Sequence, residues 1–257
     1  MKRSLFAFVA LFVLLVFSAS AYAHGHDHGH GHKKEKKKGI LLVAFGSSYP
    51  QAQASFENIE AKVKKAFPKT PVRWAYTSKI IRDIMAEKGQ DLDSPALALA
   101  EMMDQGFTHV AVQSLHTIGG VEFHDLLGVV KGFETMPGSF EEISVGYPLL
   151  ASQKDIALVS ELLLQNVPEH RKANEAVIFM GHGTHHPSNA FYSALMYNLQ
   201  QIDTNAYVAV VEGWPLLADI KEELEQKQIE KVYLLPCMSV AGDHIRNDMA
   251  GADPDSW

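Results

Sequence analysis

The sequence predicts an α/β protein with two similar lobes, each a parallel β-sheet flanked by α-helices. Short apolar runs alternate along the chain with segments whose apolar residues recur at helical spacing, which is typical of βα units. The same order of segments occurs twice. LLVAFGSS corresponds to VIFMGHGT, and Gly46 and Gly181 near their ends lie 135 residues apart. Because ligands of such sheets bind beyond the carboxyl ends of the strands, we expect an active site in a cleft between the lobes.

The first half begins with a buried strand over 39–45, a continuous apolar run that leads into a Gly-Ser-Ser turn. A helix over 51–67 follows, because Phe56 and Val63 recur at helical spacing and Pro68 stops the helix. The other elements predicted here are strands over 72–77, 109–114 and 143–145 and helices over 78–88, 95–106 and 122–133.

The second half repeats the pattern, and we place the two lobes at 39–146 and 147–257. Its predicted elements are helices over 152–167, 187–201 and 215–226, strands over 176–180, 207–211 and 231–235, and a loop from Gly242 that leads to a helix. The first half has a fourth strand that the second half lacks. We therefore expect the natural chain to be longer at its carboxyl end.

Residues 1–23 are typical of a secretory signal peptide. Lys2 and Arg3 precede a 13-residue apolar run, and residues 21–23 form an A-x-A cleavage site. The run is too short to span a bilayer, which takes about 20 helical residues. We expect cleavage, a periplasmic protein and no stable membrane span afterwards, with an uncleaved anchor as the alternative.

Residues 24–38 read as a flexible tail rich in histidine and lysine. Glycine and like charges prevent a packed core there, and neutral imidazole binds late divalent metal ions. We interpret the tail as a metal collector, and a solubilising spacer is the alternative. The histidines concerned are His24, His26, His28, His30 and His32.

Composition excludes some classes of function. The chain has 257 residues, 47% of them hydrophobic, and a formal net charge of −7. Residues 39–257 hold 16 basic and 28 acidic side chains, a net charge of −12, which argues against a nucleic-acid partner. A single cysteine, Cys237, excludes an internal disulfide.

Three metal-binding residue types follow successive strands of the second half. His182, Glu212 and His244 come from consecutive βα units, which a parallel sheet brings side by side. Two imidazoles and a carboxylate can bind a divalent ion and leave positions open for a substrate. A rival site within the GHGTHH loop would use His185 and His186, which we treat as secondary.

Several strings resemble one protein family. GHGTHHPSNAFY, VEGWP, LLPCMSVAGDHIRNDMAG, AFGSSY and QSLHTIGGVEFH are similar to sequences of the anaerobic-type cobaltochelatases of the cobalamin pathway, and the resemblance covers 39–257. These are class II tetrapyrrole chelatases related in fold to ferrochelatase. The resemblance implies ATP-independent insertion of Co²⁺ into sirohydrochlorin. It maps the family's metal-binding residues onto His182, Glu212 and His244.

Metal insertion requires loss of water from the ion and removal of two pyrrole protons. We expect His182 to act as ligand and base, because neutral imidazole binds such ions and accepts protons near neutral pH. Glu212 would hold the ion and balance its charge, and His244 would complete the set. We expect both His182 and Glu212 to be catalytic.

The flat polycarboxylate substrate needs local donors, because the net charge of the body is unfavourable. Candidates for orienting it are Ser47, Ser48, His116, Gly119 and Gly120, with Lys79, Arg82 and Arg246 as basic candidates. His124 is a candidate axial ligand for haem, with a surface histidine as the alternative.

Two other functions stay open at this level. A periplasmic protein that binds or transports a divalent metal or haem could share the two lobes and the His/Glu site. A chelatase that uses Fe²⁺ or Ni²⁺ is the second alternative, because these ligand types do not separate the metals. A homo-oligomer is compatible with the sequence.

Overall fold

The computed structural model describes residues 35–240, 242, 245–253 and 256–257. The predicted signal peptide, the five tail histidines (His24, His26, His28, His30 and His32) and His244 lie outside the described residues. No helix in the described part of the chain is long and apolar enough to cross a membrane.

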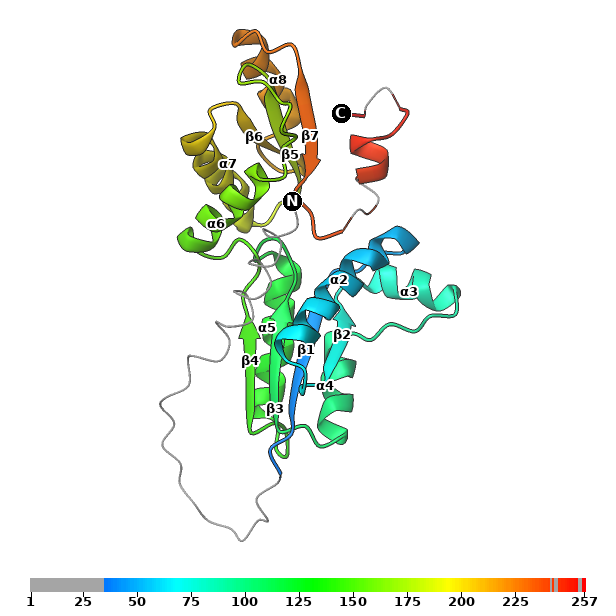
Figure 1. The fold of residues 1–257 in the computed structure, drawn as a ribbon. Helices are drawn as coiled ribbons and strands as arrows, with labels where there is room; N and C mark the ends of the chain where they lie inside the picture. The colour runs from blue at the N-terminus through cyan, green and yellow to red at the C-terminus, as the bar shows by residue number, and fades with distance from the viewer. Residues whose placement is uncertain (1–34, 241, 243–244, 254–255) are drawn as a thin grey trace. The chain divides into compact units, whose positions relative to one another are not determined.

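The chain forms two compact units, and both sheets are entirely parallel, as predicted (Figure 1). Unit 1 comprises residues up to Gly46 together with Phe56–Leu115 and His124–Tyr147. Unit 2 comprises Pro148–Trp257 and two short segments of the first half, Ser47–Ser55 and His116–Phe123. Both short segments follow the carboxyl ends of strands.

Unit 1 contains a four-stranded sheet with the strand order β2-β1-β3-β4. Its strands are β1 (Lys38–Ala44), β2 (Val72–Tyr76), β3 (His109–Ser114) and β4 (Glu142–Gly146), and its helices are α2 (Pro50–Ala66), α3 (Lys79–Glu87), α4 (Pro95–Asp104) and α5 (Val121–Thr135). The first residues of α2 and α5 are assigned to unit 2.

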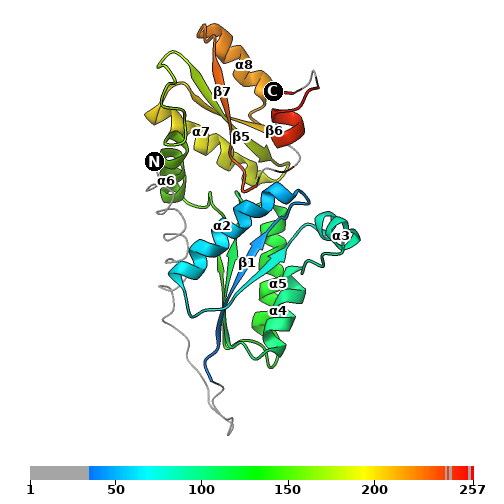
Figure 2. The same ribbon diagram turned by 45° about the vertical axis from the view of Figure 1, so that its right-hand side comes forward.

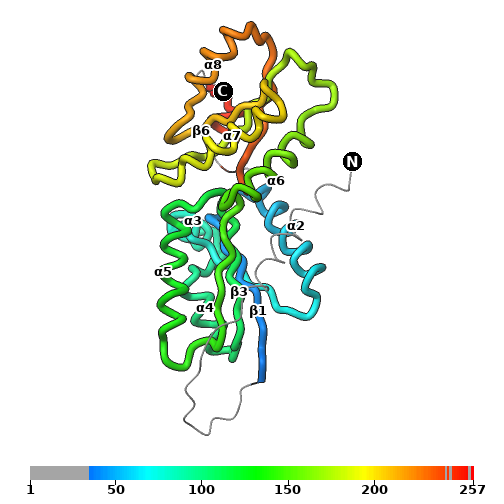
Figure 3. Tube along the Cα trace, turned by 90° about the vertical axis from the view of Figure 1, so that its left-hand side faces the viewer, coloured from blue at the N-terminus to red at the C-terminus, as the bar shows by residue number. Residues whose placement is uncertain are grey.

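Helices cover both faces of this sheet. Figures 2 and 3 show α2 on one face and α4 and α5 on the other. Ile40 and Leu42 of β1 pack with Val63 of α2. A Cβ on Gly39 would come within 2.5 Å of Met102 in α4, so alternate residues of β1 face opposite helices. Burial on both faces is why this strand is a continuous apolar run rather than an alternating one.

Unit 2 contains a three-stranded sheet with the order β6-β5-β7. Its elements are α6 (Gln153–Leu164), β5 (Ala176–Gly183), a 3₁₀ turn (Pro187–Asn189), α7 (Ala190–Ile202), β6 (Ala206–Glu212), α8 (Leu217–Gln226), β7 (Val232–Pro236) and a π-helix (Ile245–Met249). α8 covers one face of the sheet, where Ile220 and Leu224 pack on Ile178 of β5, and Tyr192 of α7 lies against Gly181 on the other (Figure 2).

The repeat inferred from the sequence is confirmed by this topology. β2-β1-β3 and β6-β5-β7 have the same strand order, and in both the first strand in sequence is the central one. One boundary differs in a way that matters for function. The prediction ended the first strand of the second half at Met180, whereas β5 continues to Gly183, so His182 belongs to the strand itself.

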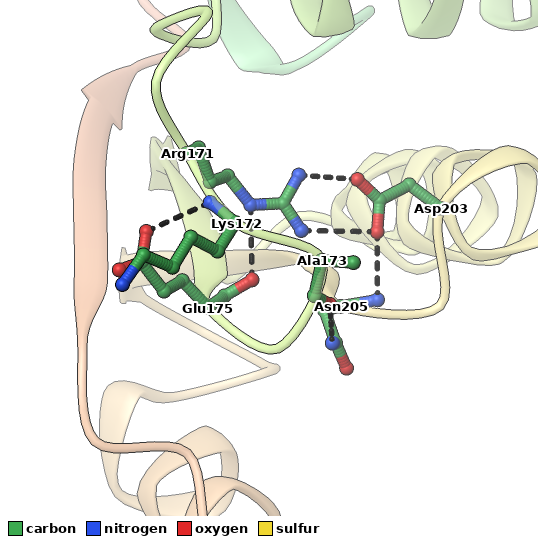
Figure 4. Close-up of polar contacts among 6 residues, drawn as sticks. All are labelled: Arg171, Lys172, Ala173, Glu175, Asp203 and Asn205. Atoms are coloured by element: carbon green, nitrogen blue, oxygen red, sulfur yellow. Dashed lines mark hydrogen bonds and ion pairs between the residues drawn. The ribbon is translucent and has the colours of Figure 1, made fainter.

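A polar network holds the amino ends of β5 and β6 together (Figure 4). The Arg171 guanidinium donates to both carboxylate oxygens of Asp203, and its Nε donates to the Glu175 carbonyl at 2.9 Å. Asn205 donates its backbone N–H to Asp203 (3.0 Å) and its side-chain amide to the Ala173 carbonyl (2.9 Å). Paired hydrogen bonds of this kind fix geometry as well as charge, so the segments that precede the two strands are tied in register.

Candidate metal-insertion site

His182 and Glu212 lie on adjacent strands at the same edge of a sheet. β5 and β6 pair in parallel with Gly183 opposite Glu212, so the glutamate stands beside the residue after His182. Both side chains are exposed. Glu212 is level with Gly183, and successive strand residues point to opposite faces, so His182 and Glu212 start from opposite faces of the sheet. What they share is the carboxyl edge of the sheet.

The His182 ring has a defined hydrogen-bond partner. Its Nδ1 lies 2.9 Å from the carbonyl oxygen of Gly183. A carbonyl oxygen can only accept, so this contact requires the proton on Nδ1 and leaves the lone pair of the neutral ring on Nε2. Histidines that bind metals through one ring nitrogen commonly donate from the other nitrogen in this way.

Gly183 brings the ends of β5 and β6 closer than any side chain would permit. Its φ is +78°, and an added Cβ would lie only 1.7 Å from the carbonyl oxygen of Glu212. The second glycine of the GHG string is therefore required both by backbone conformation and by space.

Tyr192 packs against the end of β5, and no pattern in the sequence predicts a role for it. A Cβ on Gly181 would lie 2.4 Å from the Tyr192 ring, so the ring occupies the space that this glycine leaves. Burial, the largest cause, raises the pKa of the Tyr192 hydroxyl, whereas backbone hydrogen bonds from Gly183 and His182 lower it. The hydroxyl thus contacts the backbone that carries His182. A glycine whose missing side chain is replaced by a ring eleven residues later leaves no recognisable signal in one sequence.

The third predicted ligand, His244, lies outside the described residues, between Gly242 and Ile245. β7, which precedes that loop, pairs with β5 on the side opposite β6. Within the described residues, no group of three or more His, Cys, Asp or Glu side chains is arranged to hold a metal ion. His182 and Glu212 are thus the members of the predicted trio that the structure describes.

The rival GHGTHH site is not supported by the position of His186. This residue stands at the N-cap of the 3₁₀ turn, where its Nδ1 accepts from the Ser188 backbone N–H at 3.1 Å. Its backbone N–H donates to Thr184 Oγ1 at 3.1 Å. One ring nitrogen of His186 is therefore engaged in local structure. His185 is exposed.

The candidates for orienting a substrate occur in the two short segments of unit 2. Ser47 is 5% exposed, and its hydroxyl accepts from the Tyr49 N–H at 3.3 Å; Ser48 is partly buried. The segment with Gly119 and Gly120 is held by a parallel bridge between Ile118 and Leu150.

His116 lies in the same segment and is partly buried. Burial lowers its pKa, and the carboxylate of Glu122, a smaller cause, raises it. Because burial has the larger effect, His116 is held in its neutral form.

The three basic candidates have different surroundings. Lys79 forms an exposed ion pair with Asp83 at 2.7 Å. Arg82 donates from Nη1 to the carbonyls of Tyr76 (2.6 Å) and Thr77 (2.9 Å), so it closes the end of β2.

Arg246 is placed differently from both. Its guanidinium carbon lies 4.8 Å from the centre of the Tyr49 ring, and its buried Nε has no hydrogen-bond acceptor among the described residues. Among the three basic candidates, Arg246 is therefore the one with a buried donor that has no acceptor among the described residues.

His124 and Cys237 differ in their exposure to solvent. His124 is exposed on α5, outside the segments of unit 2. Cys237, which directly follows β7, is 5% exposed, and burial raises the pKa of its thiol to about 12. Burial therefore disfavours the thiolate, which is the form that binds metals.

Comparison with known proteins gives consistent results. Residues 38–257 match the family described as cobalt chelatase (CbiK). The chain is 42% identical over 221 residues to the sirohydrochlorin cobaltochelatase CbiKC of Nitratidesulfovibrio vulgaris (strain Hildenborough), covering 86% of this chain and 78% of that protein. It is 35% identical over 223 residues to the sirohydrochlorin cobaltochelatase of Salmonella typhimurium, covering 86% and 83%.

A solved structure supports the fold. SirB from Bacillus subtilis with Fe³⁺ aligns over 84% of this chain and 79% of its own, with a TM-score of 0.53 and 18% sequence identity. At that identity the likeness concerns the fold, and it agrees with the chelatase-like architecture expected from the sequence.

Proposed function

The chain belongs to the cobalt chelatase (CbiK) family, and from this membership we propose that it inserts Co²⁺ into sirohydrochlorin. The observation that carries the proposal is the match over residues 38–257, which includes His182 and Glu212 on adjacent strands. Insertion exchanges two pyrrole N–H protons of the macrocycle for one divalent ion. The site must therefore hold the ion, receive two protons and release the metal to four nitrogens.

In this proposal the substrate ion is bound by His182, Glu212 and His244. The hydrogen bond from His182 Nδ1 to the Gly183 carbonyl supports Nε2 as the metal-binding atom. The Glu212 carboxylate offsets one positive charge of the ion. Imidazole nitrogens and a carboxylate suit Co²⁺ and leave coordination positions for the incoming pyrrole nitrogens.

The single lone pair on Nε2 imposes an order on the reaction. A neutral imidazole with its proton on Nδ1 can hold either the metal or a proton at Nε2, but not both. His182 therefore acts first as a ligand and accepts a pyrrole proton only after the ion has moved to the macrocycle. The other proton needs another acceptor, and Glu212, on the adjacent strand, is the one we propose.

We assign the orientation of the substrate carboxylates to unit 2. Arg246, stacked on Tyr49, is the proposed cation, because its Nε lacks an acceptor among the described residues and a guanidinium matches a carboxylate bidentately. Ser47, Ser48 and the Gly119–Gly120 backbone are proposed as neutral donors, and His116 as a neutral side chain beside them. Replacing Arg246 with Met should raise the KM for sirohydrochlorin about 10-fold. The control is Arg73→Met, on an exposed residue hydrogen-bonded to Gln105, which should leave KM unchanged.

The direct test mixes purified protein with sirohydrochlorin and Co²⁺, Fe²⁺ or Ni²⁺ in separate reactions and follows the visible absorption of the macrocycle. Faster insertion with Co²⁺ than without protein supports the proposal, and the other two arms measure metal preference. If the protein binds Co²⁺ but accelerates insertion of none of the three metals, it is a metal-binding protein and the proposal is wrong.

Export and the histidine tail stay as proposals from the sequence. Residues 1–23 have the charge, apolar length and cleavage site of a signal peptide, and residues 24–38 carry five histidines. Amino-terminal sequencing of protein from the periplasmic fraction should begin at His24. Removal of residues 24–38 should reduce the number of Co²⁺ ions bound without lowering the maximal rate of insertion.

Haem binding by His124 and self-association are also proposals. The ring is exposed on α5, where it is accessible to an external ligand. Titration with haem should produce an absorption band near ~400 nm that is absent from the His124→Ala variant. Light scattering before and after the titration would give the oligomeric state.

A further inference from the structure

The side chain of Asn189 connects the loops that follow the two strands of the metal site. Its Oδ1 accepts from the backbone N–H of Thr184 at 3.1 Å, and its Nδ2 donates to the carbonyl of Trp214 at 2.6 Å. Thr184 lies two residues after His182, and Trp214 lies two residues after Glu212. One planar amide thus joins the backbone beyond each proposed ligand.

The backbone of Asn189 explains why its side chain does not cap α7. Asn189 ends the 3₁₀ turn directly before α7, and its backbone is helical (φ −55°, ψ −27°) rather than extended as in a capping asparagine. Here the side chain makes no capping hydrogen bond to the described residues of α7. Its donor and its acceptor are directed to the two loops instead.

The two loops pack closely around the side chain of Asn189. A Cβ on Gly213 would lie 2.8 Å from Asn189 Oδ1 and 2.9 Å from the Thr184 carbonyl oxygen. On the strand side, Gly183 approaches the Glu212 carbonyl closely enough to exclude a Cβ. Asn189 and the two glycines therefore join the ends of β5 and β6 into one closely packed structure.

We propose that Asn189 is a positioning residue that fixes the backbone separation of His182 and Glu212 and so preorganises the site for Co²⁺. This inference rests on the proposed function for its choice of ion. Without the amide, Thr184 and Trp214 lose their shared hydrogen-bond partner, so the strand ends beyond the Gly183–Glu212 pair are held less firmly and binding of Co²⁺ has to order them. Positioning groups of this kind are worth about 10-fold or more in metal affinity. The tetrapyrrole itself does not require this connection.

The test uses the full chain carrying Asn189→Ala or Asn189→Leu. Leucine has the same branching and the same number of side-chain heavy atoms as asparagine but makes neither hydrogen bond, so the pair separates loss of the connection from creation of a cavity. Co²⁺ binding is titrated by absorption and calorimetry without tetrapyrrole. Binding by the His182→Ala variant is subtracted, because that variant keeps the histidine tail and reports the Co²⁺ that binds without an intact ligand set. Sirohydrochlorin binding is measured separately without metal.

Both variants should bind Co²⁺ about 10-fold more weakly and bind sirohydrochlorin within about twofold of the unmodified protein. Asn198→Ala is the control, since Asn198 lies on the same helix but bonds to Ala194 and Gln153, and it should change neither affinity. Thermal unfolding shows whether each variant is folded, and the leucine variant serves if the alanine variant is not.

Unchanged Co²⁺ affinity in Asn189→Leu would overturn the inference, as would equal loss of Co²⁺ and sirohydrochlorin affinity. Failure of the proposed function looks different. In that case the unmodified protein inserts no metal, while the Co²⁺ titrations still report whether Asn189 positions the two ligands.

Discussion

β1 and β5 are the central strands of their sheets and have neighbours in the same order, yet their carboxyl ends carry different side chains. After β1, Ser47 is buried and its hydroxyl binds the Tyr49 N–H, and Arg82 closes the carbonyls at the end of β2. At the ends of β5 and β6, His182 and Glu212 are exposed.

This difference shows how one backbone arrangement serves two purposes. In the first half, neighbouring residues already hydrogen-bond to the polar groups at the strand ends, so few of these groups are available to coordinate an ion. In the second half the backbone is held by glycines and by Asn189, so the side chains at the edge are available for chemistry. Parallel topology supplies equivalent edges, and the residues placed there decide which edge reacts.

The largest difference between the two halves is expected when the His182 imidazole is removed. His182→Ala should lower the rate of Co²⁺ insertion about 1000-fold, because it removes a metal ligand and a proton acceptor. Ser47→Ala, at the corresponding strand end of the first half, should lower it by less than about 10-fold. Initial rates from the absorption of the macrocycle test both. Similar losses in the two variants would mean that both edges contribute equally to the reaction.

Two glycines with a positive φ separate the cost of that conformation from the cost of a steric clash. Gly183 and Gly89 have nearly the same φ, +78° and +77°, but a Cβ on Gly89 meets nothing within 4 Å. Gly89→Ala should therefore cost only the conformational strain, about 1 kcal/mol. Gly183→Ala should cost about 3 kcal/mol and lower insertion, because it also displaces the end of β6. Urea unfolding measures the two free energies, and equal values would contradict the close approach of the strands.

The two sheets also differ in the contacts at the amino ends of their central strands. β1 is preceded by Lys37, whose backbone bonds to Thr108, whereas β5 is preceded by the Arg171–Asp203 pair. Arg171→Ala should lower the free energy of unfolding by about 2 kcal/mol at neutral pH, because the Arg171 side chain is 9% exposed and its removal leaves a carboxylate without its partner.

The pH dependence of this loss has a definite sign. The Arg171 guanidinium, the largest cause, holds the pKa of Asp203 below its ordinary value of 3.8. A lowered pKa in the folded state gives stability that is fully present above that ordinary value and is lost as pH falls through the folded pKa. The unfolding free energies of the two proteins should therefore converge in acid, and a difference that stays constant down to pH ~2 would be inconsistent with the ion pair.

The smallest effect is expected where the two halves are alike. β3 ends with the buried Ser114, and β7 is followed by the buried Cys237. Cys237→Ser makes the second half resemble the first at this position and should leave Co²⁺ insertion within about twofold, since burial raises the pKa of the thiol and disfavours the thiolate that would bind a metal. A large loss of Co²⁺ affinity would show that Cys237 takes part in the site.

Much of the architecture could be predicted because its signals are local. Apolar runs, helical spacing and terminal glycines identified the strands and helices, and the 135-residue repeat anticipated the shared strand order. The parallel arrangement of successive βα units also anticipated that His182 and Glu212 share one edge. The end of β5 was placed three residues too early, because a Gly-His-Gly string reads as a turn until the partner strand is known.

The roles of the residues that support the site could not be predicted from the sequence, for a different reason. Nothing in the sequence distinguishes Asn189, which joins two loops, from Asn198, which bonds to Ala194 in its own helix and to Gln153 in α6. The same holds for Arg82 and Arg246, of which one closes a strand end and the other stacks on Tyr49.

By itself, the sequence determined the order of the elements, the two sheets and the residue types at their carboxyl edges, because burial and chain stiffness act over short stretches of chain. Only the tertiary structure decided the contacts that hold those edges, such as Tyr192 against Gly181 and Asn189 between Thr184 and Trp214. A hydrogen bond or a close packing contact depends on positions to within a few tenths of an ångström. Those positions exist only after distant parts of the chain have packed together.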